Sequence, residues 1–229
     1  MNSEKLNLFL RLRSVLMRVF FDLLYNQMAW SYDLVADIVS LGMWRDWVRA
    51  VIPYLNGPQV LELGHGPGHL QVALHEKTTE APNSLQVIGL DKSKQMGQIA
   101  KRRLIRHGYQ STLINGDAQM LPLPDESVHQ IVATFPSEYI SSPHTLEEVK
   151  RVLKPGGKLV ILALAWITGK RLHQRAAAKL FEITGQAPAW DDHFLEPARM
   201  KGFEALAERV DGKNSQMQII IITKFVERA

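Results

Sequence analysis

Residues 60–70, Val-Leu-Glu-Leu-Gly-His-Gly-Pro-Gly-His-Leu, decide the fold of this chain. A short apolar run leads into three glycines at two-residue spacing, Gly64, Gly66 and Gly68, and a helical pattern follows. This order predicts a strand, a loop without bulky side chains, and a helix. Glycines let a ligand lie against the backbone at the carboxyl end of a strand, where open α/β sheets bind cofactors. The stretch therefore predicts a ligand-binding loop in an α/β protein.

The spacing of these glycines discriminates between classes of ligand. A dinucleotide-binding GxGxxG turn would place its third glycine at residue 69, which is His69, and no Lys-Ser or Lys-Thr follows to make a phosphate-binding loop. An acidic residue, Glu62, lies two places before the first glycine. The pattern argues against a nucleotide-sugar or NAD-dependent oxidoreductase, which would also need a Tyr-x-x-x-Lys element. A purely structural tight turn remains the alternative.

A polar or small residue follows each of the next predicted strands. Residues 85–91 form a buried strand ending at Asp91, about 20 residues after the loop, where a carboxylate accepts hydrogen bonds from ribose hydroxyls. Residues 111–115 lead into Gly116-Asp117-Ala118, and residues 128–135 form the fourth strand. Because the carboxyl ends of parallel strands meet at one edge of a sheet, we expect these side chains to lie close together.

The remaining pattern completes one mixed sheet. The predicted elements are a helix capped by Ser93 and ended by Gly108, helices over 143–153 and 172–183, and strands over 159–165, 203–210 and 215–225. Gly156-Gly157 is expected to end the first of the two later helices. The turn Asp211-Gly-Lys-Asn214 predicts a hairpin, so the last strand is antiparallel to its neighbour. Residues 185–197, which are aromatic and acidic, form either a surface loop or a roof over an acceptor pocket.

Taken together, four ordered motifs resemble those of the class I S-adenosylmethionine-dependent methyltransferases. They are Glu62-Leu-Gly-His-Gly-Pro-Gly68, Asp91, Gly116-Asp-Ala118 with Leu121-Pro-Leu-Pro-Asp125 behind it, and Arg151-Val-Leu-Lys-Pro-Gly-Gly157. The resemblance covers residues 28–165 well. It implies an α/β, Rossmann-like seven-stranded mixed sheet in the order 3-2-1-4-5-7-6 with helices on both faces. It also implies an N-terminal helical lid or extension over residues 1–56 and a catalytic domain over residues 57–229.

The resemblance implies S-adenosyl-L-methionine as cofactor and S-adenosyl-L-homocysteine as product. The residues implied for cofactor binding are Glu62, Gly64, Gly66, Gly68, Asp91, Lys92, Met96, Asp117, Ala118 and Phe135. Asp91 would bind the ribose hydroxyls, and Asp117 and Ala118 would bind the adenine. Met96 or Lys92 would flank that ring, and Phe135 would lie beneath the methyl group. The alternatives are a place in the helix core for Met96 and turn formation for the two aspartates.

The segment ahead of the loop is similar to that of the methyltransferases of ubiquinone and menaquinone synthesis. It contains Tyr32-Asp33 followed by Ser40-Leu-Gly42. The resemblance implies an aromatic side chain that closes over the cofactor, and Tyr32 is the candidate, with an interface anchor as the alternative. The three tryptophans of this segment, Trp30, Trp44 and Trp47, are interpreted as packing residues. The implied acceptor is a small, apolar or lipid-like molecule, such as a quinone precursor methylated on carbon or oxygen.

The chain departs from that family after the fourth strand. Quinone methyltransferases carry an Arg-Asn element there, whereas this chain reads Phe135-Pro-Ser-Glu138-Tyr139. Glu138 and Tyr139 are therefore the candidates for substrate contact, with ordinary loop polarity as the alternative. A phenol or enol acceptor would need a base. The residues eligible by location are His65, His69, His144 and Glu138, and none is assigned as catalytic.

Residues 6–25 predict an amphipathic helix. Its polar stripe consists of Asn7, Arg11, Ser14, Arg18 and Asp22. A helix of this length spans roughly 30 Å, but three arginines oppose a membrane span. Three interpretations remain open: a lid packed across the catalytic domain, a helix lying on a membrane surface, and a homodimer contact.

Composition narrows the remaining classes. A chain of 229 residues with 46% hydrophobic residues suits one compact α/β unit. The absence of cysteine excludes disulfides, thiolate zinc sites and a thiol nucleophile, and no metal-ligand spacing is recognised. The start of the chain shows no signal-peptide pattern, which predicts a cytoplasmic protein. A catalytically silent cofactor-binding protein and a nucleic-acid or protein methyltransferase remain alternatives, although no basic and aromatic stripe supports nucleic-acid binding.

Overall fold

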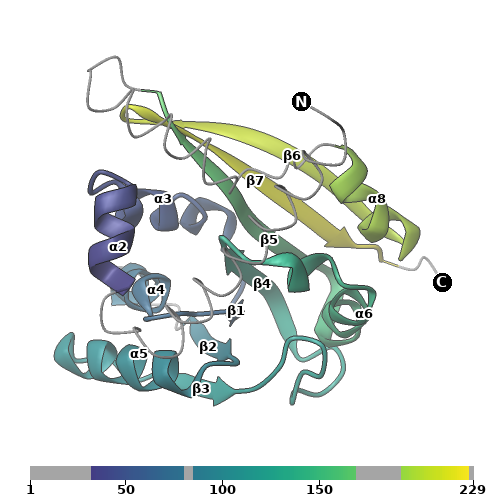
Figure 1. The fold of residues 1–229 in the computed structure, drawn as a ribbon. Coiled ribbons are helices and arrows are strands. Elements are labelled where there is room, and N and C mark those ends of the chain that lie inside the picture. Colours follow the sequence, from purple (N-terminus) through teal and green to yellow (C-terminus); the bar gives the residue numbers. More distant parts are fainter. Residues whose placement is uncertain (1–31, 80–84, 169–191, 227–229) are drawn as a thin grey trace, which may run out of the picture.

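The computed structural model describes residues 32–79, 85–168 and 192–226 (Figure 1). The predicted helices over 6–25 and 172–183 lie outside the described residues. Of the stretch 185–197, the described part begins a helix, α8 (Asp192–Met200), rather than a loop.

Seven strands form one sheet in the order β3-β2-β1-β4-β5-β7-β6, as expected. The strands are β1 (Gln59–Leu63), β2 (Gln86–Asp91), β3 (Thr112–Asn115), β4 (Val128–Thr134), β5 (Leu153–Ile167), β6 (Phe203–Gly212) and β7 (Ser215–Lys224). Strands β1 to β5 pair in parallel. Strand β7 is antiparallel to both β5 and β6, which confirms the predicted hairpin.

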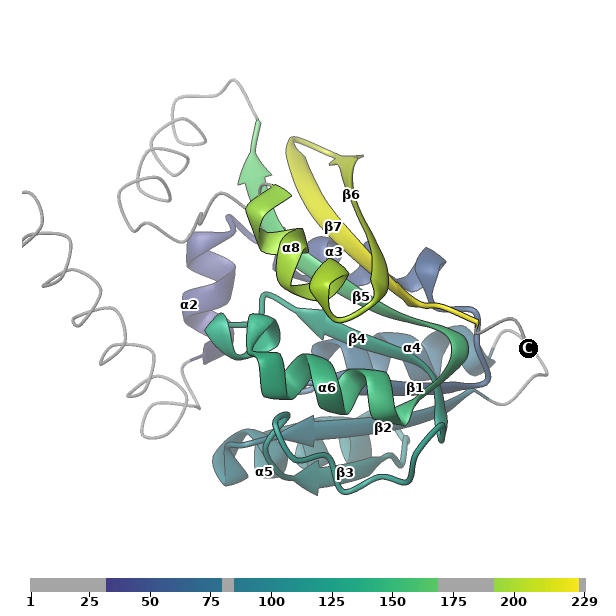
Figure 2. The same ribbon diagram turned by 90° about the vertical axis from the view of Figure 1, so that its right-hand side faces the viewer.

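Helices cover both faces of the sheet (Figures 1 and 2). They are α2 (Tyr32–Val39), α3 (Trp44–Arg49), α4 (His69–Thr79), α5 (Lys94–Arg106), α6 (Pro143–Val152) and α8, with short 3₁₀ turns η2 (Ile52–Tyr54) and η3 (Glu138–Ser141). Helices α4 and α5 lie on one face, and α6 and α8 lie on the other (Figure 2). Ser93 caps α5 as predicted, because its hydroxyl accepts a hydrogen bond from the Met96 amide.

The alternation of side chains along the central strands divides the core in two. Along β4, Ile131 and Ala133 join the hydrophobic cluster beneath α6 and α8, whereas Val132 joins the cluster beneath α3 and α4. Successive residues of a strand point to opposite faces, so a sheet covered on both sides needs apolar residues throughout. Trp47 and Leu55 are buried in the second cluster. The described end of the N-terminal extension therefore shares a core with the sheet.

One predicted boundary is wrong. Gly156-Gly157 does not end helix α6, which stops at Val152, and β5 begins at once with Leu153. The pairing of β4 with β5 shifts between Val128 and Gln130, and the two glycines lie in this irregularity. A Cβ on Gly157 would lie 2.9 Å from the His129 carbonyl oxygen. Gly157 is thus needed for close backbone approach within the sheet, and Gly156 for its positive φ angle of 74°, and neither ends the helix.

Arg151 holds the loop between β3 and β4 against helix α6. Its guanidinium donates hydrogen bonds to the carbonyl oxygens of Leu121, at 2.9 Å, and Leu123, at 2.8 Å. It also pairs with the carboxylates of Glu148 and Asp125, each at 2.7 Å. A planar guanidinium with five donors can serve all four of these groups at once, whereas an ammonium group has only three donors on a single nitrogen.

We expect Arg151→Lys to lower the free energy of unfolding by about 2 kcal/mol, because a lysine leaves some of these acceptors without a donor. Urea denaturation followed by circular dichroism measures the change. Arg209→Lys on the exposed part of β6 is the control and should change the stability by less than about 0.5 kcal/mol. Equal effects of the two variants would contradict the anchoring role of Arg151.

Candidate functional site

A pocket of about 630 Å³ opens beside the carboxyl ends of β1 to β4. This pocket is lined by many of the residues that the sequence predicted to bind cofactor or substrate: Glu62, Gly64, Gly66, Asp91, Lys92, Asp117, Ala118, Phe135 and Tyr139. The strand ends therefore converge as expected. Three implicated residues, Gly68, Met96 and Glu138, are not among the lining residues. Tyr32 begins α2, and its side chain lies outside the described part of the chain.

The glycine loop, residues 64–68, is shaped by its neighbours on both sides. Gly64 and Gly68 have φ angles of 69° and 85°, in the left-handed region that side chains rarely adopt. A Cβ on Gly64 would lie 2.7 Å from the Tyr139 hydroxyl, and one on Gly68 would lie 2.9 Å from Ala100 of α5. Gly64 thus leaves room for the hydroxyl of Tyr139. Gly68 instead allows α5 to pack against the loop.

Asp91 ties the glycine loop to the end of β2. Its two carboxylate oxygens accept hydrogen bonds from the amides of Gly66 and Ser93, each at 2.8 Å. An ionised carboxylate has about four acceptor positions, so about two are left for other donors. Asp91 is partly exposed and lines the pocket. It can therefore hold the loop and bind a diol at the same time.

Asp117 and Lys92 meet at the rim of the pocket. The Lys92 ammonium lies 2.8 Å from one carboxylate oxygen of Asp117, and the Gln119 amide donates to the other at 2.9 Å. These hydrogen bonds keep the pKa of Asp117 below its usual value. Ala118, beside it, is nearly buried. The carboxylate at this end of the pocket is thus ionised and held in place.

Glu62 is a carboxyl group almost fully removed from water. It accepts a 2.7 Å hydrogen bond from the Gln71 amide, and Gln71 in turn accepts one from the Ser111 hydroxyl at 2.7 Å. Burial raises the pKa of Glu62 to about 8, and the nearby charge of Asp91 adds to this shift. Such a group favours a cation beside it, because a positive charge stabilises its ionised form.

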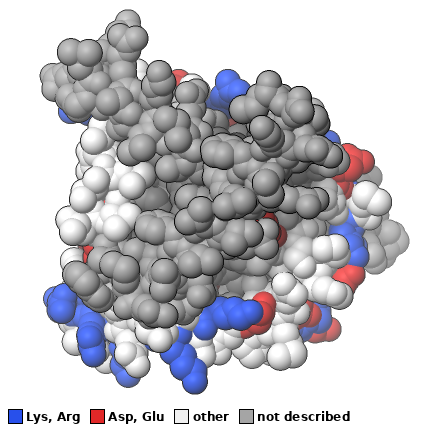
Figure 3. Space-filling view, in the orientation of Figure 1, with Lys and Arg blue, Asp and Glu red and all other residues white. Residues whose placement is uncertain are grey.

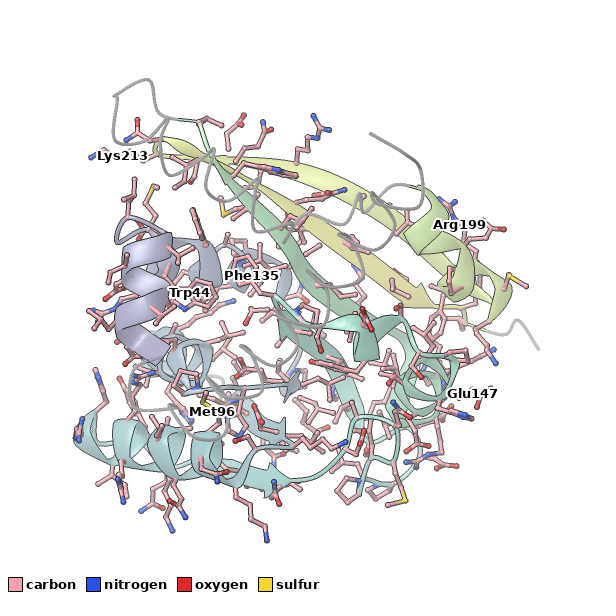
Figure 4. All side chains as sticks on the ribbon, viewed as in Figure 1. Trp44, Met96, Phe135, Glu147, Arg199 and Lys213 are labelled. Atoms are coloured by element: carbon pink, nitrogen blue, oxygen red, sulfur yellow. The ribbon has the colours of Figure 1, made fainter. Side chains whose placement is uncertain are left out.

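Aromatic residues form the wall beyond the end of β4. Phe135 stacks on Trp44 with ring centroids 4.7 Å apart and meets the edge of Trp47 at 6.2 Å (Figure 4). Phe135 has a φ angle of 48°, a strained conformation for a residue with a side chain. Trp44, interpreted from sequence as a packing residue only, also lines the pocket. Nothing in its local pattern shows this, because its stacking partner, Phe135, lies about 90 residues further along the chain, directly after β4.

Of the other side chains predicted to belong to the site, some line the pocket and some do not. Met96 is fully buried, as a core residue would be (Figure 4). Tyr139 lines the pocket and donates a 3.2 Å hydrogen bond to the Leu63 carbonyl oxygen, whereas Glu138 is exposed. Of the histidines, His65 and His69 line the pocket and His144 does not. Nδ1 of His65 lies 2.7 Å from the Gly66 carbonyl oxygen, which can only accept, so this nitrogen carries the proton.

Residues 17–186 match the model of the ubiE/COQ5 methyltransferase family. The chain belongs to this family. Membership confirms the resemblance to S-adenosylmethionine-dependent methyltransferases on which the expected cofactor was based. Within the described ranges, the chain has no group of three His, Asp or Glu side chains placed to hold a metal ion.

Individual relatives agree with this assignment. The chain is 39% identical over 145 residues to a demethylmenaquinone methyltransferase of Thermotoga maritima, a match covering 62% of this chain and 60% of the relative. It is 34% identical over 144 residues to a ubiquinone/menaquinone biosynthesis C-methyltransferase of Legionella pneumophila, covering 60% and 56%. The matched region thus spans less than two thirds of these relatives. The fold is similar to that of a protein of Methanococcus maripaludis, with a TM-score of 0.62, 19% identity and coverage of 90% and 96%.

The carboxyl of Glu62 predicts a pH-dependent stability. Its pKa is about 8 in the folded protein and about 4.5 when exposed. Between pH 4.5 and pH 8, Glu62 therefore takes up a proton when the chain folds. The stability that the protein has while Glu62 is neutral is fully present below about pH 4.5. It is lost as the pH rises through about 8, because the buried carboxyl group then becomes charged. We therefore expect Glu62→Gln to be more stable than the unaltered protein at pH 8, by on the order of 2 kcal/mol.

Thermal melting of the ligand-free proteins from pH 5 to pH 8 measures this difference. Glu204→Gln, at an exposed position of β6, is the matched control and should follow the unaltered protein at every pH. A constant gap between Glu62→Gln and the unaltered protein across this range would show that Glu62 does not take up a proton on folding.

Proposed function

We propose that this chain is an S-adenosyl-L-methionine-dependent methyltransferase whose acceptor is a small, planar, uncharged ring of the quinone-precursor type. The observation that carries the proposal is that three different recognition chemistries share one pocket. These are the buried carboxyl of Glu62, the carboxylate of Asp91 with free acceptor positions, and the fixed carboxylate of Asp117. Their order along the pocket follows the strand order of the sheet, β1, β2 and β3.

Each of these groups suits one part of the cofactor. Glu62 favours a cation and would bind the ammonium group of the methionine part next to the glycine loop. Asp91 would accept hydrogen bonds from the ribose hydroxyls. Asp117 and the amide of Ala118 would bind the edge of the adenine, with Lys92 at the rim. Met96, which does not line the pocket, would support the loop and α5 from within the core.

The residues of the chain contribute to methyl transfer mainly by positioning. When bound, the cofactor supplies a methyl group already activated on a sulfonium. An in-line attack needs the acceptor atom about 3 to 3.5 Å from the reacting carbon, and correct orientation provides much of the rate. The sulfur would lose its positive charge as the acceptor gives up a proton to water or a base, so an apolar wall such as Trp44 and Phe135 would favour the transfer. Tyr139, fixed by the Leu63 carbonyl oxygen, would orient the acceptor from the other side.

The uncharged side chains that line the pocket near the end of β4 favour an uncharged ring as the acceptor. The described lining residues in this part of the pocket are Trp44, Val48, Thr134, Phe135, Pro136, Ser137 and Tyr139, and none carries a charge at neutral pH. Flat rings stack well on such aromatic side chains. The names of the two relatives, which refer to demethylmenaquinone and to ubiquinone/menaquinone biosynthesis, are consistent with this chemistry.

We further propose that the protein contacts a membrane surface. Residues 6–25 lie outside the described residues, so a lid, a membrane-surface helix and a homodimer contact remain the alternatives for this segment. Nearby, α2 exposes Leu34 and Ile38 by 60% and 63%, which supports contact with a lipid-like environment. No helix in the described ranges is long and apolar enough to cross a membrane. A cytoplasmic location stays a prediction.

We expect titration calorimetry to show saturable binding of S-adenosylmethionine and none of NADH. Asp91→Asn should weaken binding at least tenfold, because an amide oxygen cannot accept hydrogen bonds from the loop and from two hydroxyls as a carboxylate does. Asp211→Asn, near the tip of the β6–β7 hairpin, is the control with the same loss of charge and should bind normally. Absence of binding to the unaltered protein would refute the proposed cofactor.

The aromatic wall predicts a separate effect on the acceptor. With a short-chain demethylmenaquinol as acceptor, Trp44→Leu should raise the acceptor KM about three- to tenfold, since an aromatic pair contributes roughly 0.5–1.5 kcal/mol. The dissociation constant of S-adenosylmethionine should stay within about twofold. Trp44→Phe retains a stacking ring and should restore the KM. If cofactor and acceptor binding fell together in Trp44→Leu, the residue would be supporting the whole pocket instead.

A further inference from the structure

Helix α5 concentrates positive charge close to the glycine loop. Lys94, Lys101, Arg102 and Arg106 are exposed on it, and lysine and arginine gather along the lower-left edge of the molecule, where α5 lies in Figure 1 (Figure 3). Arg103 differs from them, because only 16% of its side chain is exposed. It points inward and donates a 2.7 Å hydrogen bond to the carbonyl oxygen of Pro67, within the glycine loop.

Asp33, in the first turn of α2, neutralises this inward arginine. One of its carboxylate oxygens pairs with the Arg103 guanidinium, and the other lies 2.9 Å from Nε2 of His69. His69 is the first residue of α4 and follows the glycine loop directly. A single carboxylate of the N-terminal region therefore contacts His69 after Gly68 directly, and reaches Pro67 before Gly68 through the guanidinium of Arg103. We call these contacts, Asp33 with Arg103 and His69, the clamp.

The charges around the clamp make Asp33 hard to replace. Burial lowers the pKa of Arg103, as do the positive charges of Arg45 and Arg106, and Asp33 is the group that counteracts them. Burial alone would raise the pKa of Asp33, but the hydrogen bond from His69 and the charge of Arg103 keep it below its usual value. A buried guanidinium that loses its carboxylate is strongly destabilising for the surrounding structure.

The clamp also connects the glycine loop to the acceptor side of the pocket. Helix α2 ends next to Ser40, whose buried hydroxyl accepts a 3.0 Å hydrogen bond from the Trp44 amide at the start of α3. Trp44 and Val48 of α3 line the same pocket as the loop. The position of α2 thus sets both the support of the loop and the place of the aromatic wall.

We propose that Asp33 is a positioning residue that couples the docking of α2 to the ligand-binding conformation of the glycine loop. Cofactor binding and helix docking then stabilise each other, because coupling between two equilibria is reciprocal. In this arrangement the pocket closes on the acceptor side only when the loop is in its ligand-binding form. The inference rests on the proposed function, since it assumes that the loop binds the cofactor.

The test compares Asp33→Asn with Asp37→Asn. Asp37 lies one turn further along α2, is exposed and carries the same charge. S-adenosylhomocysteine is the ligand, its dissociation constant is measured by calorimetry, and hydrogen exchange of residues 33–40 is followed with and without it. In the unaltered protein and in Asp37→Asn, the ligand should protect these amides. In Asp33→Asn, affinity should fall about tenfold and the protection should be lost.

A double-variant cycle separates coupling from general destabilisation. Arg103→Gln should reduce affinity to a similar extent, and combining it with Asp33→Asn should add little, because both variants break one interaction. If Asp33→Asn does not fold, Asp33→Glu keeps the charge but changes its reach, and the same loss of ligand-induced protection is expected. Normal affinity and normal protection in the folded Asp33 variant would overturn the inference. Failure of the unaltered protein to bind S-adenosylhomocysteine would instead refute the proposed function.

Discussion

The hydrogen bond from the Gly66 amide to Asp91 is the interaction on which the rest of the site depends. It joins the loop after β1 to the end of β2, the neighbouring strand of the sheet. The glycine loop can follow this path because Gly64 and Gly68 adopt left-handed backbone angles that other residues rarely accept. Glu62 lies on β1 directly before this junction, and α5 packs against Gly68 directly after it.

The pocket is organised by the different surroundings of its carboxyl groups. Glu62 is buried and protonates easily, whereas Asp117 is held ionised by Lys92 and the Gln119 amide. A single sequence pattern of acids after strands thus yields groups with different chemistry. A ligand with a cation at one end and a hydrogen-bond donor at the other satisfies both. This division of roles follows from burial and hydrogen bonding, and not from residue type.

The end of the pocket beside β4 is where the sequence departs from the pattern expected of the quinone methyltransferases. In place of an Arg-Asn element, the chain has Phe135 in a strained conformation stacked on Trp44. Backbone strain of this kind persists only where the surrounding packing enforces it. Here the stack against α3 provides that packing. The same contact links α3 to the end of β4, so this end of the pocket is built by two distant parts of the chain.

The sequence by itself determined the strand–loop–helix at residues 60–70, the cap at Ser93, the β6–β7 hairpin and the acids at the strand ends. These features depend on side-chain periodicity and on local backbone preferences, which neighbouring residues set. Only the tertiary structure decided that β5 begins at Leu153, that Glu62 is buried, that Trp44 faces the pocket and that Asp33 meets Arg103, 70 residues away. Burial and pairing between distant residues are properties of the packed sheet and its helices. A local sequence pattern therefore does not predict them.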